Sequence, residues 1–313
     1  MKKNADKIKQ KTVSGNWKTQ LGYYLMFIPP TVLVFIFSYI PMAGIYMAFT
    51  DYKPVKGIWG SKFVGLKHFI QFFTSQDFVR IFRNTILYNV ASIVIVYLGC
   101  GILFALLLYE IKSKIGNKIF QTAMLLPAFL SWTVVSACLY MILSPDAGYL
   151  NRLLEFLGMQ PISWYRESKY WPYIITLANM YKGAGMSSIY FFAALLSIDT
   201  ELFDAANLDG ANRIQQIYHI SLPALKSVIC LTMILKMGDV LTAGVSPYYE
   251  LTFDQGVLYE TTQVIGTYLK NGLRGGRFSF TTAVGLAESL ISTIMVVGAN
   301  TIVKKIDPES AMF

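Results

Sequence analysis

Long apolar runs alternate with polar segments along this chain of 313 residues. Each run is long enough to cross a bilayer as a helix of about 20 residues. Backbone amides in hydrocarbon must be hydrogen-bonded within their own segment, so the runs are predicted to be helices. The pattern therefore predicts an all-α polytopic membrane protein with six transmembrane helices, at residues 21–49, 84–109, 119–144, 171–197, 222–243 and 280–303.

The composition agrees with a membrane protein. The chain is 54% hydrophobic and 14% charged, whereas a soluble domain is about 25% charged. Its net charge of +9 comes from lysines and arginines that flank the apolar runs, where they set topology and contact lipid headgroups. The basic balance is therefore not interpreted as nucleic-acid binding.

The distribution of lysines favours a cytoplasmic N-terminus. Six lysines precede residue 21, and three more lie in the short loop before residue 119, and short cytoplasmic loops carry such an excess. The expected division is a basic cytoplasmic tail at 1–20, a transmembrane domain at 21–303 and a short cytoplasmic tail at 304–313. A cleaved signal peptide is not expected, because the first run is too long and contains Pro29, Pro30 and Pro41.

Two polar regions have local patterns of their own. In the external segment 50–83, the stretch FVGLKHFIQFF is apolar every three or four positions, which predicts an amphipathic surface helix. Residues 198–221 are acidic and cannot lie in hydrocarbon. There, Gly210 can end one short helix in the left-handed conformation, Asp209 or Asn212 can cap a second, and Pro223 suits the first turn of the next span. A helix–turn–helix knob outside the bilayer is expected.

The knob also carries a family resemblance. Asp204-Ala205-Ala206, Asp209-Gly210-Ala211 and the closing Ile220, Leu222 and Pro223 resemble the EAA-type motif in membrane subunits of binding-protein-dependent ABC importers. The sequence departs at Asp204, where glutamate is usual, and at Ile217, where an aromatic is common. The resemblance implies a type I importer permease fold with both termini cytoplasmic. It also implies that the loop couples to an ATPase subunit, through Asp204, Ala205, Ala206, Asp209, Gly210, Ala211 and Arg213.

The resemblance extends over most of the chain. ANRIQQIYHISLP, VLYETTQVIGTYLKNGL and FSFTTAVGLAESLIS are similar to the branch of these permeases associated with oligosaccharides and polysaccharide fragments in Gram-positive bacteria. It implies a second permease, ATPase subunits and an external lipoprotein solute-binding protein in the bacterial cell membrane. Whether the permeases form a homodimer or a heterodimer stays open, as does the identity of the sugar.

Enzyme chemistry is not expected of this chain. No phosphate-binding GxxxxGK[ST] loop occurs, so ATP hydrolysis is assigned to a partner and no cofactor is expected. Cys100, Cys138 and Cys230 fall within apolar runs, and His68 and His219 are isolated, which gives no metal-ligand spacing. An ion-coupled secondary carrier remains an alternative, although no internal repeat is found; an importer permease for a solute other than a sugar is another.

Candidate residues of a transport pathway come from charge and aromaticity within the spans. Charge at bilayer depth is costly and usually faces a cavity or a partner, which singles out Lys182, Asp239 and Glu288. Lys236 and Asp239 can pair at i,i+3, so their role can equally be structural. Aromatic rings that can stack on sugars complete the set, at Trp132, Tyr181 and Tyr190.

Overall fold

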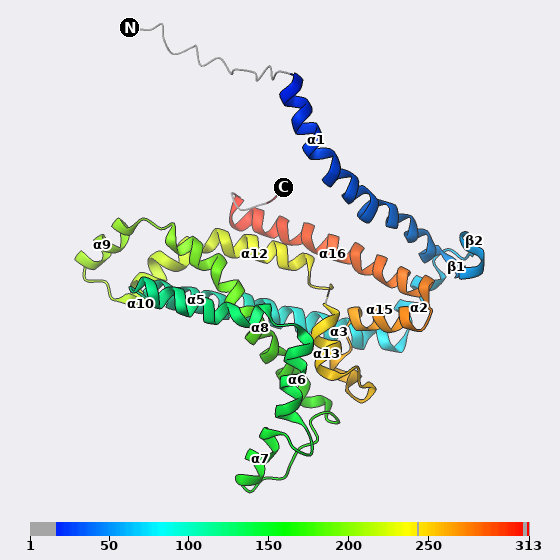
Figure 1. Ribbon diagram of the computed structural model, residues 1–313. Coiled ribbons are helices and arrows are strands. Elements are labelled where there is room, and N and C mark those ends of the chain that lie inside the picture. Colours follow the sequence, from blue (N-terminus) through cyan, green and yellow to red (C-terminus); the bar gives the residue numbers. More distant parts are fainter. Residues whose placement is uncertain (1–16, 243, 309–311, 313) are drawn as a thin grey trace.

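The computed structural model describes residues 17–242, 244–308 and 312, and most of them are helical. The basic tail expected at 1–20 lies mainly outside these residues. Long helices lie side by side in a bundle, and one end of the bundle carries α9 (Thr200–Leu208) and α10 (Arg213–Gln216). The opposite end carries the hairpin of β1 (Thr50–Lys53) and β2 (Gly57–Phe63) (Figure 1).

Three helical stretches of the described chain are long and apolar enough to cross a membrane unbroken, namely Leu21–Phe49, Gln76–Glu110 and Phe278–Lys305. The first includes most of α1 (Trp17–Val34), the second contains α3 (Gln76–Ala91) and α4 (Gly101–Glu110), and the third includes all but the last residue of α16 (Phe278–Ile306). Three further spans are bent helix pairs. Counting each pair as one span gives the six that the apolar pattern predicts.

The third span differs from its prediction as one helix over 119–144. It is broken into α5 (Lys114–Phe129) and α6 (Trp132–Leu143), which meet at 93°. Leu130 and Ser131 are extended, and the Ser131 hydroxyl accepts a hydrogen bond from the Val134 N–H at 3.2 Å. A serine cap satisfies a free amide at the start of a helix, so the break is stabilised inside an unbroken apolar run.

The fifth span also differs from its prediction. The helix that begins with α10 continues through α11 (Leu222–Ala224), bends by 54° and resumes as α12 (Lys226–Gly238). Pro223 therefore lies just before the bend and does not open the span. Asp239 follows the last residue of α12, so it sits at a helix end and not within the helix expected over 222–243.

The external end contains both an expected and an unexpected element. The amphipathic helix is confirmed as α2 (Lys67–Phe73), which buries His68 and Phe72. The β1–β2 hairpin before it was not predicted; it is antiparallel, with Thr50 opposite Phe63. The last loop folds into α13 (Val245–Thr252), α14 (Tyr259–Thr262) and α15 (Ile265–Arg274), and α7 (Tyr149–Phe156) follows α6.

Small residues bring α8 (Trp171–Leu196) against its neighbours. A Cβ on Gly101 of α4 would lie 2.9 Å from the Ser187 hydroxyl, and one on Gly185 would collide with the Met124 carbonyl of α5. Glycine permits such close helix contacts in membranes. The first span, by contrast, is nearly uncovered: only 6% of its most apolar window is buried, and α1 diverges from the bundle (Figure 1).

Candidate functional site

The knob, residues 198–221, begins with a short helix whose two ends are both capped. Asp199 caps α9, its carboxylate accepting from the Glu201 N–H at 3.0 Å. At the other end Gly210 has a φ of 78°. The Ala211 N–H donates to the Ala206 carbonyl at 2.9 Å, and the Gly210 N–H donates to the Asn207 carbonyl at 3.1 Å. These two bonds are the Schellman arrangement, as the glycine predicts.

The second helix of the knob, α10, starts at Arg213 and is preceded by Asn212. The Gln215 N–H donates to the Asn212 side-chain oxygen at 2.9 Å, and the Asn212 N–H donates to the Gln215 side-chain oxygen at 2.7 Å. Asn212 is therefore the cap, in a reciprocal capping box. Gln216 is 3% exposed, and its amide donates to the Asn207 side chain at 2.7 Å, which ties α10 to α9.

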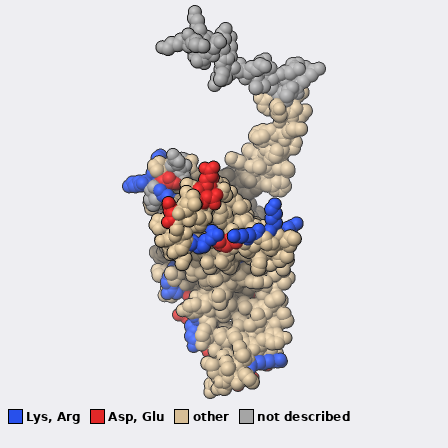
Figure 2. Space-filling view, turned by 90° about the vertical axis from the view of Figure 1, so that its left-hand side faces the viewer, with Lys and Arg blue, Asp and Glu red and all other residues tan. Residues whose placement is uncertain are grey.

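Contacts with α4 hold the knob on the bundle. The rings of Phe203 in α9 and Tyr109 in α4 are 5.8 Å apart. Arg213 lies 3.8 Å from the Glu110 carboxylate, although both side chains are exposed, so the pair adds little stability. Acidic and basic side chains gather on this end of the molecule (Figure 2).

The free face of the knob combines polar and apolar groups. Asp204, Ala205, Asp209 and Gly210 are exposed. A pocket of about 320 Å³ lies between α9 and α10 and is lined in part by Ala206 and Ala211. Sequence reasoning missed the large apolar side chains on the same segment, whose exposure is Leu208 90%, Leu202 55%, Ile214 65% and Tyr218 64%. The sequence signal that could have revealed them was the presence of apolar residues inside an otherwise polar loop.

The structure joins two of the candidate pathway residues across helices. Lys182, near the middle of α8, donates a hydrogen bond to the Leu130 carbonyl at the break between α5 and α6. Its ammonium also lies 5.0 Å from the centre of the Trp132 ring at the start of α6. The break frees a carbonyl, and the lysine satisfies it. Lys182 and Trp132 are therefore neighbours at a bend.

The two tyrosines of α8 are not brought together. Tyr181 lines an apolar pocket of about 320 Å³ together with Met124 and Pro127 of α5. Tyr190 is nine positions further on, about 180° around the helix at 3.6 residues per turn. Both rings are more than half exposed, and they face opposite directions, so one cavity cannot be lined by both.

The remaining candidates lie on α12 and α16. The Lys236 ammonium is 3.5 Å from the Asp239 carboxylate, as their spacing predicts, and 4.2 Å from the centre of the Tyr97 ring. The Asp239 side chain is 63% exposed. Glu288, by contrast, is 9% exposed on α16. It shares a helix face with Ser292, whose buried hydroxyl has no hydrogen-bond partner among the described residues. These groups form separate sites.

The region that contains the knob matches a known family. Residues 97–311 match the family described as "Binding-protein-dependent transport system inner membrane component". The protein belongs to this family. The matched region includes the whole knob and every candidate pathway residue named above. The protein is accordingly a multi-pass permease subunit in the bacterial cell membrane, and its family role is not catalytic.

Individual relatives match nearly the full chain of this permease. It is 38% identical over 287 residues to the Polygalacturonan/rhamnogalacturonan transport system permease protein YteP of Bacillus subtilis, covering 91% of this chain and 88% of the relative. A solved bacterial ABC transporter involved in import of the acidic polysaccharide alginate superposes with a TM-score of 0.84 at 32% identity, covering 93% of this chain and 97% of that one.

A second solved structure shows the same transporter fold with a binding protein. It is described as a bacterial alginate ABC transporter in complex with an alginate pentasaccharide-bound periplasmic protein, and it matches with a TM-score of 0.82 at 32% identity, over 92% of this chain and 96% of that one. The permease thus has the type I ABC importer fold that the motif in the knob predicts.

Proposed function

We propose that this permease is one membrane subunit of an ATP-driven importer that moves oligosaccharides delivered by an external solute-binding protein. ATP is bound and hydrolysed by a separate ATPase subunit, which docks on the knob, and a second permease completes the pathway. The observation that carries the proposal is the knob itself: a rigid, exposed helix–turn–helix with unburied apolar side chains at one end of the bundle. The similarity to YteP and to the alginate importer supports a carbohydrate as the cargo.

The hydrogen bonds within the knob allow it to move as one unit, so that it transmits a movement of the ATPase subunit instead of deforming. Its helices are closed by the Schellman turn at Gly210 and the capping box at Asn212, and Gln216 joins them. α9 follows α8 after a 72° bend, and α10 continues towards α12. A push by an ATPase subunit on the knob would therefore reach both α8 and α12, because α9 is joined to α8, and α10 leads to α12, each through a single bend.

The exposed face of the knob has the chemistry of a protein docking site. Leu208 and Ile214 are large apolar side chains that water contacts in the isolated subunit. Burying such side chains against a partner stabilises a complex by about 25 cal/mol per Å² of apolar surface. The carboxylates of Asp204 and Asp209 beside them supply specificity for a basic surface.

Transport in reconstituted vesicles tests the proposal. The permease is co-purified with its second permease and ATPase subunits and placed in liposomes with the binding protein outside. Uptake of radiolabelled trigalacturonate is expected only with ATP inside and the binding protein present. Uptake driven by a proton or sodium gradient without ATP would refute the proposal. Transport of sn-glycerol-3-phosphate but of no oligosaccharide would support the ATP-driven importer and refute oligosaccharide as its cargo.

A further inference from the structure

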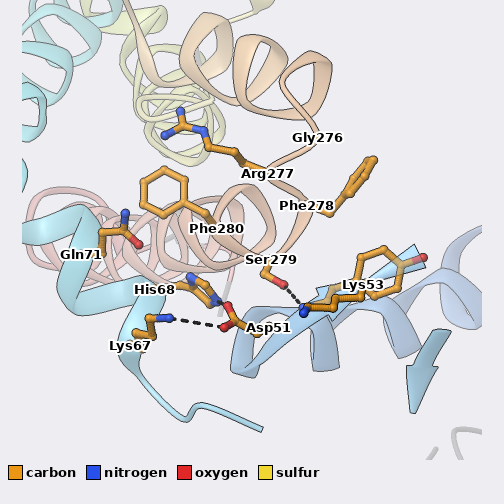
Figure 3. A pocket seen from close by; sticks show the side chains of 11 residues that line it. Asp51, Lys53, Lys67, His68, Gln71, Gly276, Arg277, Phe278, Ser279 and Phe280 are labelled. Carbon is orange, nitrogen blue, oxygen red and sulfur yellow. Dashed lines mark hydrogen bonds and ion pairs between the residues drawn. The ribbon is translucent and has the colours of Figure 1, made fainter. Parts of the chain in front are cut away.

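Another cavity lies at the end of the bundle opposite the knob. It has a volume of about 400 Å³ and opens between β1, α2 and the residues that begin α16 (Figure 3). Cavities of this size lie in the range that binds small molecules. The glycine-rich stretch around Gly276, which the coupling and pathway assignments leave unused, forms part of its wall.

The cavity has an excess of positive charge. Its one carboxylate, Asp51, is shared by the Lys67 ammonium and the His68 ring, each at 3.4 Å. Lys53 and Arg277 also line the cavity. Neither forms an ion pair with a carboxylate among the described residues, and both are exposed. Two cationic groups therefore remain for an anionic ligand.

Aromatic rings form the other wall. The Arg277 guanidinium lies 4.9 Å from the centre of the Phe280 ring and 5.8 Å from that of Tyr268, so it is within cation–π distance of two rings. Tyr52 and Phe278 meet edge to face at 5.8 Å. A planar guanidinium held in this way presents paired N–H groups to a carboxylate.

The cavity is a built site. The Tyr52 N–H donates to the Ser279 hydroxyl at 2.8 Å, which fastens the hairpin to α16 across the chain. Gly276 has a φ of 71°, a conformation that places Arg277 and that other residues rarely adopt. His68, only 6% exposed, lines the cavity, and its Nδ1 atom has no hydrogen-bond partner in the described part of the chain.

We propose that this cavity binds one acidic sugar residue, a hexuronate, at the external face of the permease. Arg277 and Lys53 pair with its carboxylate, the face of an aromatic ring packs on the sugar ring, and His68 with Gln71 takes its hydroxyls. A neutral sugar would leave both cations without a partner. The inference rests on the proposed function, since it names the class of oligosaccharide that the importer carries, and the site adds selectivity before the sugar enters the membrane.

Direct binding tests the site. The purified permease complex, without binding protein, is titrated with trigalacturonate and with the carboxyl-reduced trisaccharide. Wild type is expected to bind only the acidic form. Arg277→Gln and Lys53→Gln should each weaken binding about tenfold, the effect of losing one charge-assisted contact. Lys56→Gln is the matched control, because Lys56 is an exposed lysine of the same hairpin that does not line the cavity, and it should bind as wild type does.

Each other outcome overturns the inference. Equal binding of the two trisaccharides would remove the role of the carboxylate, and unchanged affinity in both variants would remove the site. Weaker association of the variants with the sugar-free binding protein, with trigalacturonate affinity retained, would assign the cavity to protein docking. Failure of the proposed function is separate, since it would appear as absent ATP-dependent uptake in wild type, whether or not the purified complex binds trigalacturonate.

Discussion

Single residues determine the shape of the knob. Gly210 is its turning point, because the Schellman hydrogen bonds require a left-handed residue at that place. No heavy atom lies within 4 Å of a Cβ built there, so backbone strain and not a steric clash is the consequence of a larger residue. The same combination, a left-handed glycine in open space, recurs at Gly158, with a φ of 77°.

Gly210→Val should weaken the coupling between the permease and the ATPase subunit. A β-branched residue in the left-handed region costs about 1–2 kcal/mol, which shifts the backbone and misplaces Asp209 and Ala211. Binding-protein-stimulated ATPase activity of the assembled complex is expected to fall about tenfold, the factor that corresponds to 1.4 kcal/mol. Gly158→Val carries the same strain outside the knob and should retain stimulation. Equal stimulation in both variants would count against docking at the knob.

Lys182 is expected to hold the bend between α5 and α6. Lys182→Met leaves the half-buried Leu130 carbonyl without its donor. An unsatisfied polar group costs about 1–3 kcal/mol when it is fully buried, so a cost at the lower end of this range is expected. Lower thermal stability of the complex and slower uptake should follow, whereas Lys182→Gln, which retains a donor, should recover part of both. Thermal unfolding in detergent and vesicle uptake measure the two effects. A Met variant with wild-type stability and uptake would show that the contact is dispensable.

At the scale of elements, bends distinguish this bundle from six straight helices, and two of the three bends follow a proline. The break at Leu130 turns α6 by 93° away from α5, and the bend at Leu225 turns α12 by 54°. Each follows a proline closely, Pro127 in one case and Pro223 in the other, and proline weakens helical hydrogen bonding. Helices that bend at fixed points move as rigid segments, which suits a permease that must open and close.

The charged pair at the end of α12 is expected to be structural. Lys236 contacts both Asp239 and the Tyr97 ring, and either charge alone near bilayer depth is costly. Lys236→Ala and Asp239→Ala should each lower the yield of assembled complex, and the double change to Met and Leu should recover it with uptake intact. Lys114→Ala, an exposed lysine at the start of α5, controls for loss of a positive charge.

Two measurements on the double variant distinguish a structural role of the Lys236–Asp239 pair from contact of Asp239 with the cargo. Size-exclusion yield reports assembly, and vesicle uptake reports transport. A double variant that assembles, keeps its stimulated ATPase activity and yet fails to import sugar would mean that Asp239 contacts the cargo, because recognition of hydroxyls leaves a buried polar group unpaired when its partner is lost.

At the scale of the whole molecule, the two ends of the bundle differ in kind. One end carries the knob, and the other carries the β1–β2 hairpin with its cationic cavity (Figure 1). The proposed function requires the knob to face the cytoplasm and the hairpin to face outside. Lys112 in the loop between α4 and α5, with Lys114 and Lys118 at the start of α5, agrees, since these lysines follow the end of α4 that contacts the knob and obey the positive-inside rule.

Thiol labelling of intact cells is expected to confirm this orientation. In a variant without Cys100, Cys138 and Cys230, single cysteines at Ser113 and Asn212 should resist an impermeant reagent, and cysteines at Val55 and Val257 should react. Val55 is 99% exposed at the tip of the hairpin, whereas Ser61 nearby is buried and unsuitable. Labelling at Asn212 before the cells are opened would invert the topology and remove the docking argument.

The apolar spans and the helix–turn–helix of the knob could both be predicted from the sequence, because both depend on residues close together along the chain. A span needs only enough consecutive apolar residues, and the contacts that end α9 and begin α10 join residues no more than five positions apart. Such contacts depend on local residue types: a glycine that tolerates positive φ, and an asparagine with a glutamine three positions later. The capping choice between Asp209 and Asn212 was the one point that the pattern left open.

Other features depend on contacts between residues far apart in the sequence, and these became visible only in the folded structure. The break at Leu130 lies in an apolar run, and its carbonyl is satisfied by Lys182, 52 positions away. Tyr181 and Tyr190 belong to one helix, yet they face opposite directions, and packing against α5 places Tyr181 in a pocket with Met124 and Pro127. The hairpin reaches α16 through Tyr52 and Ser279, 227 positions apart. The apolar spans and the helix–turn–helix of the knob follow from local pattern, so the amino-acid sequence was enough to predict them; the bends and the cationic cavity depend on side chains that meet only when the chain is folded.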